Sequence, residues 1–336
     1  MRAIHVTPVD GSATDEKGRP LRPGPESLII GEIDTPAPDE GEVLVRTVAA
    51  GINRADLLQR QGLYPPPKGV SETIGLEAAG VVESVGAGVT DWSPGDEVVA
   101  LLAGGGYAEY FVAPAGQLIA PPEAVDLITA ATLMEVAATV LSNMDHVRLA
   151  EGETFLVHGG AGGIGTFAIQ YAKALGCRVA ATAGSAAKLQ HCRDMGADIA
   201  LDYHDDWVQG LKDATEGRGA DVILDIMGAK YLGSNVDAMA QDGRTVIIGM
   251  QGGVKGELNI AKLLNKRATV TATSLRYRPT DQKVDICRQV AERIWPLVEQ
   301  GRIKPAPIEE FPFADAAKAH ARLESGQVTG KLVLVL

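Results

Sequence analysis

Two different patterns of apolar and polar residues divide the chain. Over residues 1–124, short apolar or alternating segments are separated by turn residues such as Ser93-Pro94-Gly95-Asp96. Segments of this kind, bounded by glycine, proline and aspartate, are typical of the strands of a β-rich barrel or sandwich. The pattern predicts mostly antiparallel strands at 41–48, 79–85 and 97–101.

From residue 125 onward the pattern changes to an apolar strand, a glycine and a helix. Because the strands are apolar along their whole length, they are expected to be buried on both faces of a parallel sheet. The predicted fold class is therefore α/β, with a doubly wound parallel sheet beside the β-rich domain. The predicted strands are 154–158, 178–182, 198–201, 221–226, 244–249 and 268–273, and the predicted helices are 166–175 and 187–195.

The end of the chain is predicted to return to the first domain. It holds an amphipathic helix, followed by an apolar strand at 331–335. We therefore expect domains at 1–124 and 125–267, with 268–336 supplying the last sheet strand and the return. Residues 10–27, rich in glycine, proline and charge, are predicted to form an exposed loop or hairpin with no assignable chemistry. The apolar positions of the helix are Val284, Ile286, Val290, Ile294 and Leu297.

Composition and charge exclude several classes of protein. With 336 residues, 46% of them hydrophobic and 22% charged, the chain is expected to fold as a globular protein of two domains. Its 31 lysines and arginines against 43 acidic residues give a net charge of −12, which argues against nucleic acid as a partner. The N-terminus lacks the apolar core of a signal peptide, and no apolar run is long enough for a membrane span.

The three cysteines point to a reducing compartment. Cys177, Cys192 and Cys287 are far apart in the sequence, so they form neither a disulfide framework nor a cysteine-rich zinc site. A cytoplasmic location is therefore expected.

A glycine-rich loop follows the strand that ends at His158. The loop reads Gly159-Gly160-Ala161-Gly162-Gly163-Ile164-Gly165 and contains the pattern G-x-G-x-x-G. Between a strand and a helix, this pattern allows a tight turn and lets the backbone approach a pyrophosphate at the helix N-terminus. The alternative, a structural turn without a ligand, is less favoured because Ala183-Gly184-Ser185 and the segment from Gly249 to Gly253 are also glycine-rich strand ends.

The second strand of the parallel sheet distinguishes the two nicotinamide dinucleotides. An NAD site has an acidic residue about 20 residues beyond the loop, where it binds the ribose 2′-hydroxyl. Here that place holds Ala183-Gly184-Ser185, followed by Lys188, so there is room and a cation for a 2′-phosphate. The sequence therefore favours NADPH, although a lone lysine on a helix is also common on surfaces.

No other catalytic pattern appears in the sequence. The six histidines form no H-x-x-x-H pair, and there is no G-x-S-x-G nucleophile elbow. His158, at a strand end, is interpreted as a packed or turn residue rather than a catalytic acid. Hydride chemistry would then belong to the cofactor, with the protein positioning and polarising the acceptor.

Three segments of the first 124 residues carry a resemblance to a known family. They are residues 50–65, with Gly51-Ile52-Asn53, residues 74–80, with Ile74-Gly75-Leu76-Glu77, and residues 92–96. Together with the cofactor loop and the closing Gly330-Lys331-Leu332-Val333, they resemble the medium-chain dehydrogenase/reductase superfamily, in its zinc-independent NADPH-dependent quinone oxidoreductase branch. Within the branch, the stress-inducible type and its bacterial relatives are the most similar.

The resemblance covers nearly the whole chain apart from residues 10–27. It implies a GroES-like catalytic domain, a Rossmann domain, and a homodimer formed through the Rossmann edge or a dimer of such dimers.

The same resemblance implies that the catalytic metal is missing. Zinc-dependent alcohol dehydrogenases of this superfamily have cysteine at the place of Asn53 and histidine at the place of Leu76. Neither asparagine nor leucine is a usual zinc ligand, and there is no four-cysteine lobe. No metal site is therefore predicted.

The resemblance also assigns roles to particular residues. Asn53, Asp56 and Tyr64 are expected to line the substrate pocket as the catalytic set. Asn53 and Tyr64 could instead serve as a turn residue and a packing aromatic, and Asp56 could orient Arg54 or Arg60. The residues expected to bind NADPH are Thr139, Ala161, Gly162, Gly163, Ile164, Gly165, Gly184, Ser185, Lys188, Tyr203, Gly228, Met250, Gln251, Ser274, Leu275, Arg276 and Lys331.

Three functions remain open at this stage. The first is NADPH-dependent reduction of a quinone, and the second is reduction of an activated C=C bond in an enone or enoyl thioester. The third is a cofactor-loaded structural protein, like the lens crystallins of this family. Where relatives often carry an aromatic residue after Glu135-Val136, this chain has Ala137-Ala138, which would widen the acceptor pocket.

Overall fold

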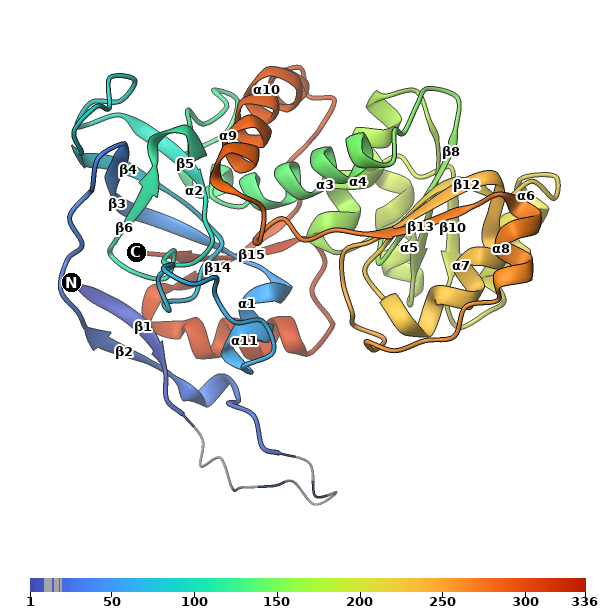
Figure 1. Cartoon of the computed structure of the whole chain (residues 1–336), viewed down its shortest axis with the longest axis horizontal. Helices are drawn as coiled ribbons and strands as arrows, with labels where there is room; N and C mark the ends of the chain where they lie inside the picture. The colour runs from blue at the N-terminus through green and yellow to red at the C-terminus, as the bar shows by residue number, and fades with distance from the viewer. Residues whose placement is uncertain (9–13, 15–17, 19) are drawn as a thin grey trace. The chain divides into compact units, whose positions relative to one another are not determined.

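The computed structural model describes residues 1–8, 14, 18 and 20–336, which form two compact units (Figure 1). Unit 1 comprises residues 1–138, 276–299 and 307–336, and unit 2 comprises residues 139–275 and 300–306. The C-terminal segments therefore belong to the same unit as the N-terminal residues. The domain boundaries expected at 124/125 and 267/268 concern independently folding domains rather than compact units, so they stay a prediction.

Unit 1 is built around a seven-stranded, mainly antiparallel sheet. The strand order is β14-β15-β3-β4-β5-β7, and β6 pairs with β3. The long central strand β3 (Glu42–Ile52) is buried over most of its length, and β15 (Lys331–Val335) pairs antiparallel with its end. Gly80 of β4 lies against β3 so closely that a Cβ there would be 2.1 Å from the Arg46 carbonyl oxygen. The other strands are β4 (Glu77–Val85), β5 (Glu97–Leu101), β6 (Tyr110–Pro114), β7 (Leu118–Ile119) and β14 (Ile308–Pro312), with β1 (Arg2–Val6) and β2 (Leu28–Glu32) pairing separately.

Helices and short turns cover the sheet of unit 1. A buried apolar cluster joins Val43 and Val45 of β3 to Leu332 and Leu334 of β15. The helices are α1 (Arg54–Arg60), α2 (Leu127–Ala130), α9 (Thr280–Gln289), a π-helical turn at Val290–Ile294, α10 (Trp295–Glu299) and α11 (Ala316–Glu324); the 3₁₀ turns are Pro25–Ser27, Ala115–Gln117 and Phe313–Asp315. Helix α3 (Met134–His146) begins in unit 1 and ends in unit 2.

Unit 2 contains a six-stranded parallel sheet with the strand order β10-β9-β8-β11-β12-β13. In chain order this is 3-2-1-4-5-6, the Rossmann arrangement, so the predicted doubly wound sheet is confirmed. Its strands are β8 (Thr154–His158), β9 (Arg178–Ala183), β10 (Ile199–Asp202), β11 (Ala220–Asp225), β12 (Met239–Ile247) and β13 (Thr269–Ala272). Its helices are α4 (Gly163–Ala174), α5 (Ala186–Asp194), α6 (Trp207–Ala214), α7 (Leu232–Ala238) and α8 (Ile260–Lys266), with a 3₁₀ turn at Gly228–Tyr231.

The differences from the predicted elements have local causes. The helix expected at 166–175 begins earlier, at Gly163, because Gly162 takes an extended conformation as its N-cap. Strand β4 starts at Glu77 rather than 79 because Glu77 and Ala78 already pair with Leu101 and Ala100 of β5. The predicted loop 10–27 falls partly outside the described residues, and its last part is the 3₁₀ turn Pro25–Ser27. Within the described part of the chain, no helix is long and apolar enough to cross a membrane.

Candidate active site

The glycine loop of unit 2 joins strand β8 to helix α4 through contacts that only glycine permits. A Cβ at Gly165 would lie 2.3 Å from the Gly159 carbonyl oxygen and 2.5 Å from the Gly160 Cα. The loop backbone therefore packs directly against itself where α4 begins. Ala161 is buried, while Gly162 is exposed ahead of the first helical turn. This leaves the backbone N–H groups of the α4 N-terminus able to bind an anionic pyrophosphate.

The turn after β9 brings together the residues predicted to bind the 2′-phosphate. Ser185 is the N-cap of α5, and its hydroxyl accepts a hydrogen bond from the Lys188 backbone N–H at 3.3 Å. The Tyr203 ring lies on Gly184, where a Cβ would be 2.2 Å from the tyrosine hydroxyl oxygen. Tyr203 itself is 45% exposed. The described residues of this turn, 183–188, include no carboxylate.

Three further predicted cofactor residues meet at the ends of β11 and β12. Gly228 has φ +72°, and a Cβ there would be 2.9 Å from the Gly249 carbonyl oxygen and 3.4 Å from the Met250 Cα. The Gln251 N–H donates to the Ile226 carbonyl at 3.3 Å. Gly228, Met250 and Gln251 therefore form one surface at the carboxyl end of the sheet, where doubly wound folds bind dinucleotides.

A buried hydrogen-bond chain lies beneath this end of unit 2. The Asn235 amide donates from Nδ2 to Asp225 Oδ2 at 3.0 Å, so its Oδ1 accepts from His158 Nε2 at 2.8 Å. His158 Nδ1 then accepts from the Thr182 hydroxyl at 3.0 Å. Burial lowers the pKa of His158 to about 4, so the imidazole is neutral. This confirms the interpretation of His158 as a packed residue.

The Asp225 carboxylate ends that chain and holds a backbone turn. It accepts hydrogen bonds from the N–H groups of Met227 at 2.6 Å and Gly228 at 3.2 Å. Burial raises the pKa of Asp225, while these donors act in the opposite direction. The chain therefore fixes Gly228 at the surface that it forms with Met250 and Gln251.

In unit 1, Asn53 lies between two oppositely charged buried side chains. Its Nδ2 donates to Glu77 Oε1 at 2.9 Å, and its Oδ1 accepts from Lys331 Nζ at 2.7 Å. Lys331 Nζ also lies 2.5 Å from Glu77 Oε1, with side-chain exposures of 5% and 0%. Lys331 was predicted to bind the cofactor; in the structure its ammonium group contacts Asn53 and Glu77.

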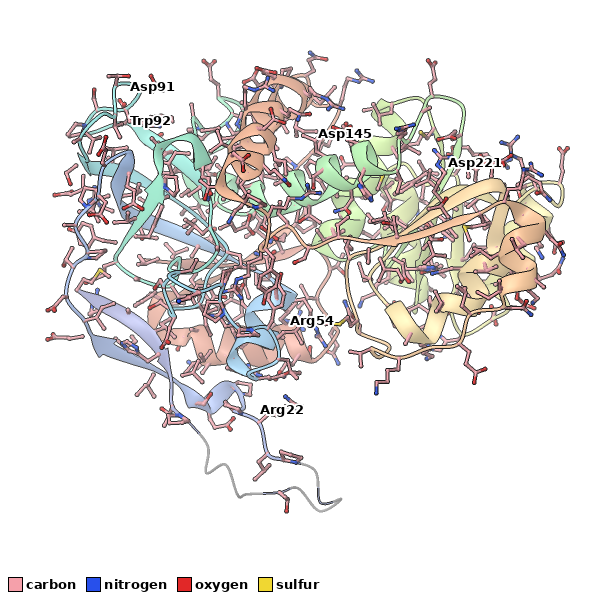
Figure 2. All side chains as sticks on the ribbon, viewed as in Figure 1. Arg22, Arg54, Asp91, Trp92, Asp145 and Asp221 are labelled. Carbon is pink, nitrogen blue, oxygen red and sulfur yellow. The ribbon has the colours of Figure 1, made fainter. Side chains whose placement is uncertain are left out.

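Asp56 begins helix α1 and is fully buried. Its Oδ2 accepts from the Asn53 N–H at 2.6 Å and from the Tyr107 hydroxyl at 3.3 Å, and its Oδ1 has no partner among the described residues. These partners differ from the predicted alternatives Arg54, labelled in Figure 2, and Arg60. Burial is the main cause that raises the pKa of Asp56 to about 7.

A second buried chain extends from Asp56. Arg60 Nη1 contacts His320 Nδ1 at 3.1 Å, and because a guanidinium only donates, the His320 proton lies on Nε2. That nitrogen donates to the Tyr107 hydroxyl at 3.2 Å, which in turn donates to Asp56. Burial first, and then Arg60, lower the pKa of His320 to about 3. At its other end Arg60 pairs with Glu324 of α11.

Tyr64 is half-buried and packs against a cation. Its ring contacts Tyr277 edge to face, with centroids 5.5 Å apart, and the Arg276 guanidinium lies 5.0 Å from the ring centroid. Arg276 also donates to the carbonyls of Ala103 and Tyr64 and to Gln59 Oε1. Three of its five N–H groups are thus used inside unit 1. The resemblance places Arg276 near the nicotinamide, and that assignment stays a prediction.

The other residues predicted near the nicotinamide lie at the ends of unit 2. Thr139 is 8% exposed on α3, and its carbonyl accepts from Asn143 Nδ2 at 2.7 Å. Leu275 is 8% exposed and follows Ser274 at the end of unit 2.

Comparison with known proteins agrees with both units. Residues 39–123 match the family described as the alcohol dehydrogenase GroES-like domain, and residues 163–290 match the zinc-binding dehydrogenase family. The quinone oxidoreductase of Pseudomonas aeruginosa is 34% identical over 318 residues, which cover 93% of this chain and 96% of that protein. The chain belongs to the quinone oxidoreductase family. It is an oxidoreductase of the medium-chain dehydrogenase/reductase superfamily.

Two further proteins match most of the chain. The Escherichia coli quinone oxidoreductase, solved in complex with NADPH, matches with a TM-score of 0.88 at 31% identity, covering all of both chains. A 2-haloacrylate reductase from Burkholderia is 29% identical, covering 93% of this chain and 96% of that protein.

The residues of this quinone oxidoreductase family member do not fit the zinc that one matched family name implies. Leu76, at one of the superfamily's ligand positions, is an apolar buried residue. The Asn53 oxygen, at the other, is 2.7 Å from the Lys331 ammonium group. The Lys331 ammonium group therefore already uses the only Asn53 atom that could bind a metal ion. In the described part of the chain, no three His, Cys, Asp or Glu residues form a group that could hold a metal ion.

Sequence reasoning missed the partners of these quinone oxidoreductase residues. Glu77 was visible as one charge inside the apolar segment 74–82, which signals a buried carboxylate with a partner. Tyr107, His320 and Asn235 carried no such signal. Their roles depend on contacts between residues far apart in the chain.

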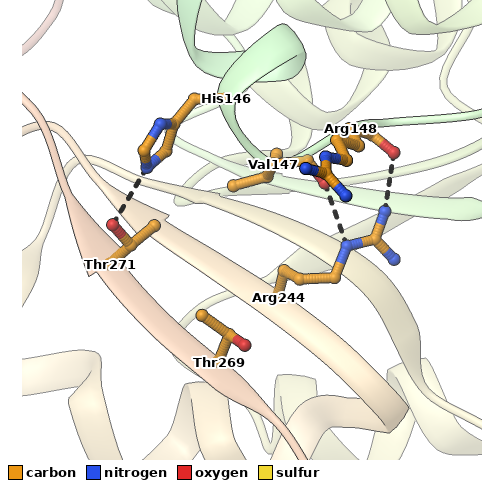
Figure 3. Close-up of a pocket in the computed structure, with 6 residues that line it drawn as sticks. All are labelled: His146, Val147, Arg148, Arg244, Thr269 and Thr271. Atoms are coloured by element: carbon orange, nitrogen blue, oxygen red, sulfur yellow. Dashed lines mark hydrogen bonds between the residues drawn. The ribbon is translucent and has the colours of Figure 1, made fainter.

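A separate pocket of about 420 Å³ lies in unit 2 (Figure 3). Arg244 donates to the carbonyls of Val147 at 3.0 Å and Arg148 at 2.9 Å and pairs with Glu153, so its charge is already compensated. Arg244 lies near the amino end of the parallel strands, whereas the glycine loop follows their carboxyl end. This pocket is therefore distinct from the cofactor loop. Its lining residues are His146, Val147, Arg148, Arg244, Thr269 and Thr271.

Proposed function

We propose that this chain reduces quinones with NADPH and without zinc. The observation that carries the proposal is the Asn53 amide, which stands where zinc-dependent relatives have a metal ligand and presents a hydrogen-bond donor instead. A quinone carbonyl gains negative charge as it is reduced, and a fixed donor at that oxygen stabilises the transition state.

The cofactor is NADPH, which supplies the hydride when bound. The α4 N-terminus, from Gly162 to Gly165, would hold the pyrophosphate, with Ala161 and Ile164 as its neighbours. Ser185, Lys188 and Tyr203 beside Gly184 would surround the 2′-phosphate, because that turn combines a hydroxyl, a cation and a tyrosine that packs on the glycine, without a carboxylate. Gly228, Met250 and Gln251 would lie along the dinucleotide. Thr139 and the segment from Ser274 to Arg276 would lie near the nicotinamide.

The remaining catalytic assignments are also part of the proposal. Asn53 would donate to the acceptor oxygen, and Tyr64 would either add a hydrogen bond or form the pocket wall. Asp56 would act through the Asn53 backbone N–H, which it fixes at 2.6 Å. Lys331, whose ammonium group is already held by Glu77, would act through Asn53 rather than on the cofactor.

A second candidate is reduction of an activated C=C bond. The Burkholderia relative named 2-haloacrylate reductase is nearly as similar to this chain as the quinone oxidoreductases. An enone or haloacrylate also develops oxyanion character as hydride arrives, so the same Asn53 donor would serve it. A cofactor-loaded structural protein remains the third candidate.

Turnover with matched acceptors distinguishes these candidates. NADPH oxidation would be measured with a simple quinone, an enone and a 2-haloacrylate. We expect kcat/KM for the quinone to exceed the others by roughly tenfold or more. Faster turnover of an enone or haloacrylate would favour the second candidate. NADPH binding without turnover of any of the three would favour the structural role.

We also propose that the protein is a homodimer, alone or within a dimer of dimers. Strand β13 is an edge of the parallel sheet, and Ile260 and Leu264 of the neighbouring α8 are 57% and 70% exposed. An open strand edge beside apolar side chains favours pairing with a second copy. Sedimentation equilibrium should give two or four times the 35.2 kDa chain mass. Leu264→Glu should reduce the mass of the assembly, and the control Leu21→Glu should leave it unchanged. A monomeric wild type would contradict the proposal.

A cytoplasmic location is proposed as well. All three cysteines are unpaired and buried, as expected for a protein that folds under reducing conditions. Cell fractionation tests it, and recovery of the protein outside the cytoplasm would contradict it.

A further inference from the structure

Glu77 and Lys331 form an ion pair inside unit 1. Their side chains are 0% and 5% exposed, and the two charged groups are 2.5 Å apart. A buried pair of this kind contributes little to stability, because removing two charges from water costs about as much as their attraction returns. The pair therefore calls for an explanation other than stability.

Asn53 contacts both members of the pair with opposite ends of its amide. The Lys331 ammonium only donates, and Asn53 Oδ1 accepts from it at 2.7 Å. The Glu77 carboxylate only accepts, and Asn53 Nδ2 donates to it at 2.9 Å. Rotating the amide by half a turn would place oxygen against carboxylate and NH₂ against ammonium. The two charges therefore allow one orientation of the amide.

The surrounding backbone holds the pair in place. Glu77 Oε2 accepts from the Glu135 N–H at 2.8 Å. Gly51 leaves the space for the carboxylate, since a Cβ there would be 2.3 Å from Glu77 Oε1. Next to Lys331, Leu332 pairs with Ile52 of β3, so the lysine and Asn53 extend from two adjacent paired strands.

This arrangement uses only one of the two N–H groups of the Asn53 side-chain amide. One proton of Nδ2 is donated to Glu77, and within the described residues the second has no acceptor. In the opposite orientation the amide oxygen would face the substrate. That oxygen would repel the negative charge that develops on the substrate during reduction. Orientation thus decides whether Asn53 helps or hinders the reaction.

We propose that Glu77 and Lys331 are positioning residues that fix the Asn53 amide so that its second N–H is available to the acceptor oxygen. This inference rests on the proposed function, in which Asn53 is the donor. It adds Glu77 to the machinery and gives Lys331 a role different from cofactor binding.

The test neutralises both charges together. A single substitution would leave one buried charge unpaired and risk unfolding, whereas Glu77→Gln with Lys331→Met keeps the volume and removes both. We expect kcat for a simple quinone to fall roughly tenfold, with the NADPH dissociation constant unchanged. The matched control is Glu309→Gln with Arg322→Met, which removes another ion pair of unit 1 and should leave kcat at the wild-type value.

The same pair of substitutions is then made in the Asn53→Ala variant. If Glu77 and Lys331 act only through Asn53, they should cause no further loss of kcat there. A tenfold loss of kcat in the Asn53→Ala variant would overturn the inference. So would an unchanged kcat when the two substitutions are made in the protein that keeps Asn53.

A measurement without any acceptor separates this inference from the proposed function. The Asn53 side-chain amide protons, observed by NMR with ¹⁵N-labelled asparagine, should give two distinct, slowly exchanging signals in the NADPH-loaded protein. In the Glu77→Gln, Lys331→Met variant these signals should shift and exchange faster. Unchanged signals would overturn the positioning role. Changed signals with wild-type quinone turnover in Asn53→Ala would confirm the positioning and contradict the proposed function instead.

Discussion

Two buried hydrogen-bond chains of similar composition lie in the two units. In unit 1 the chain runs from His320 through Tyr107 to Asp56, and in unit 2 it runs from His158 through Asn235 to Asp225. Each begins at a neutral imidazole and ends at a carboxylate. Asp225 accepts from two backbone N–H groups and an amide. Asp56 accepts from one N–H and one hydroxyl, and its Oδ1 has no partner in the described part of the chain.

The difference shows how hydrogen-bond donors influence the protonation state of a buried carboxyl group. Both sites raise the pKa of their aspartate by burial, and hydrogen-bond donors oppose that effect. Asp56 has fewer donors, and its pKa is raised to about 7. The chain in unit 1 therefore contains an acid that titrates near neutral pH. This acid contacts Asn53, which is proposed to donate to the acceptor. The chain in unit 2 lies beneath Gly228, which is proposed to contact the cofactor.

The largest expected effect concerns Asp56 and stability. A folded pKa of about 7 against 3.8 means that the folded protein holds a proton that the unfolded chain releases. The stabilisation is fully present below pH 3.8 and is lost as the pH rises through 7. The loss is on the order of 4 kcal/mol. The Asp56→Asn variant should not lose this stabilisation. Above pH 7 its free energy of unfolding should therefore be larger than that of the wild type.

Denaturant unfolding between pH 4 and 8 measures this difference. Asp91→Asn, at an exposed aspartate, serves as the control and should follow the wild-type curve. If the Asp56→Asn and wild-type curves run parallel, Asp56 is not buried as a neutral acid.

The next effect concerns His158, in the hydrogen-bond chain of unit 2. It changes stability with pH in the opposite direction. His158 has a folded pKa of about 4 against 6.5, so its contribution to stability is present above pH 6.5 and is lost as the pH falls through 4. The loss is roughly 3 kcal/mol. His158→Gln should weaken the acid dependence of unfolding. An unchanged acid dependence, with His320 still in place, would assign the acid sensitivity to unit 1 instead.

The turn after β9 in unit 2 is proposed to determine cofactor selectivity, with an expected effect of similar size. Two charge-assisted hydrogen bonds to the 2′-phosphate, each about 1.5–3 kcal/mol, should make NADPH bind on the order of a hundredfold tighter than NADH. Lys188→Ala should weaken NADPH and leave NADH nearly unchanged. Isothermal titration with both cofactors measures this, and equal dissociation constants in the wild type would show that the turn does not read the phosphate.

Turnover is expected to depend on unit 1. Asn53→Ala should lower the single-turnover rate constant for a simple quinone by roughly ten- to a hundredfold, with little change in NADPH affinity, because it removes a donor to the reacting oxygen. Tyr64→Phe should do less, since its ring packs against Tyr277 and Arg276. An unchanged rate constant in Asn53→Ala would mean that the site works by holding the two reactants together.

The two units also differ in how far the sequence reveals them. The strands of unit 2 and its loop from Gly159 to Gly165 are predictable because local rules govern them: apolar strands, a glycine turn and a helix start. Ser185 follows a strand and was chosen for the same reason, whereas Tyr203 was assigned only through the resemblance, and the cofactor roles of both stay predictions.

The site in unit 1 is less predictable because its contacts are long-range. Lys331 reaches Asn53 across 278 positions, and Tyr107 reaches His320 across 213. No local pattern encodes such pairs, and the resemblance that assigned Asn53 to the acceptor assigned Lys331 to the cofactor rather than to Asn53. Only the isolated charge of Glu77 in an apolar segment indicated that a partner existed.

The smallest expected effect is that of metal removal, which should be none. In unit 1 the two superfamily ligand positions hold Leu76, which offers no lone pair, and Asn53, whose oxygen accepts from the Lys331 ammonium group at 2.7 Å. A zinc ion there would face a fixed positive charge, with one neutral ligand in place of the anionic cysteine that usually compensates it. Prolonged dialysis of the NADPH-loaded protein against a chelator should therefore leave quinone turnover unchanged. The Glu77→Gln, Lys331→Met variant should not gain a zinc requirement either, because Leu76 still lacks a ligand atom. Activity that is lost on dialysis and restored by zinc would show that the metal binds through other residues, and the Asn53 donor would then no longer be needed to explain how the acceptor is polarised.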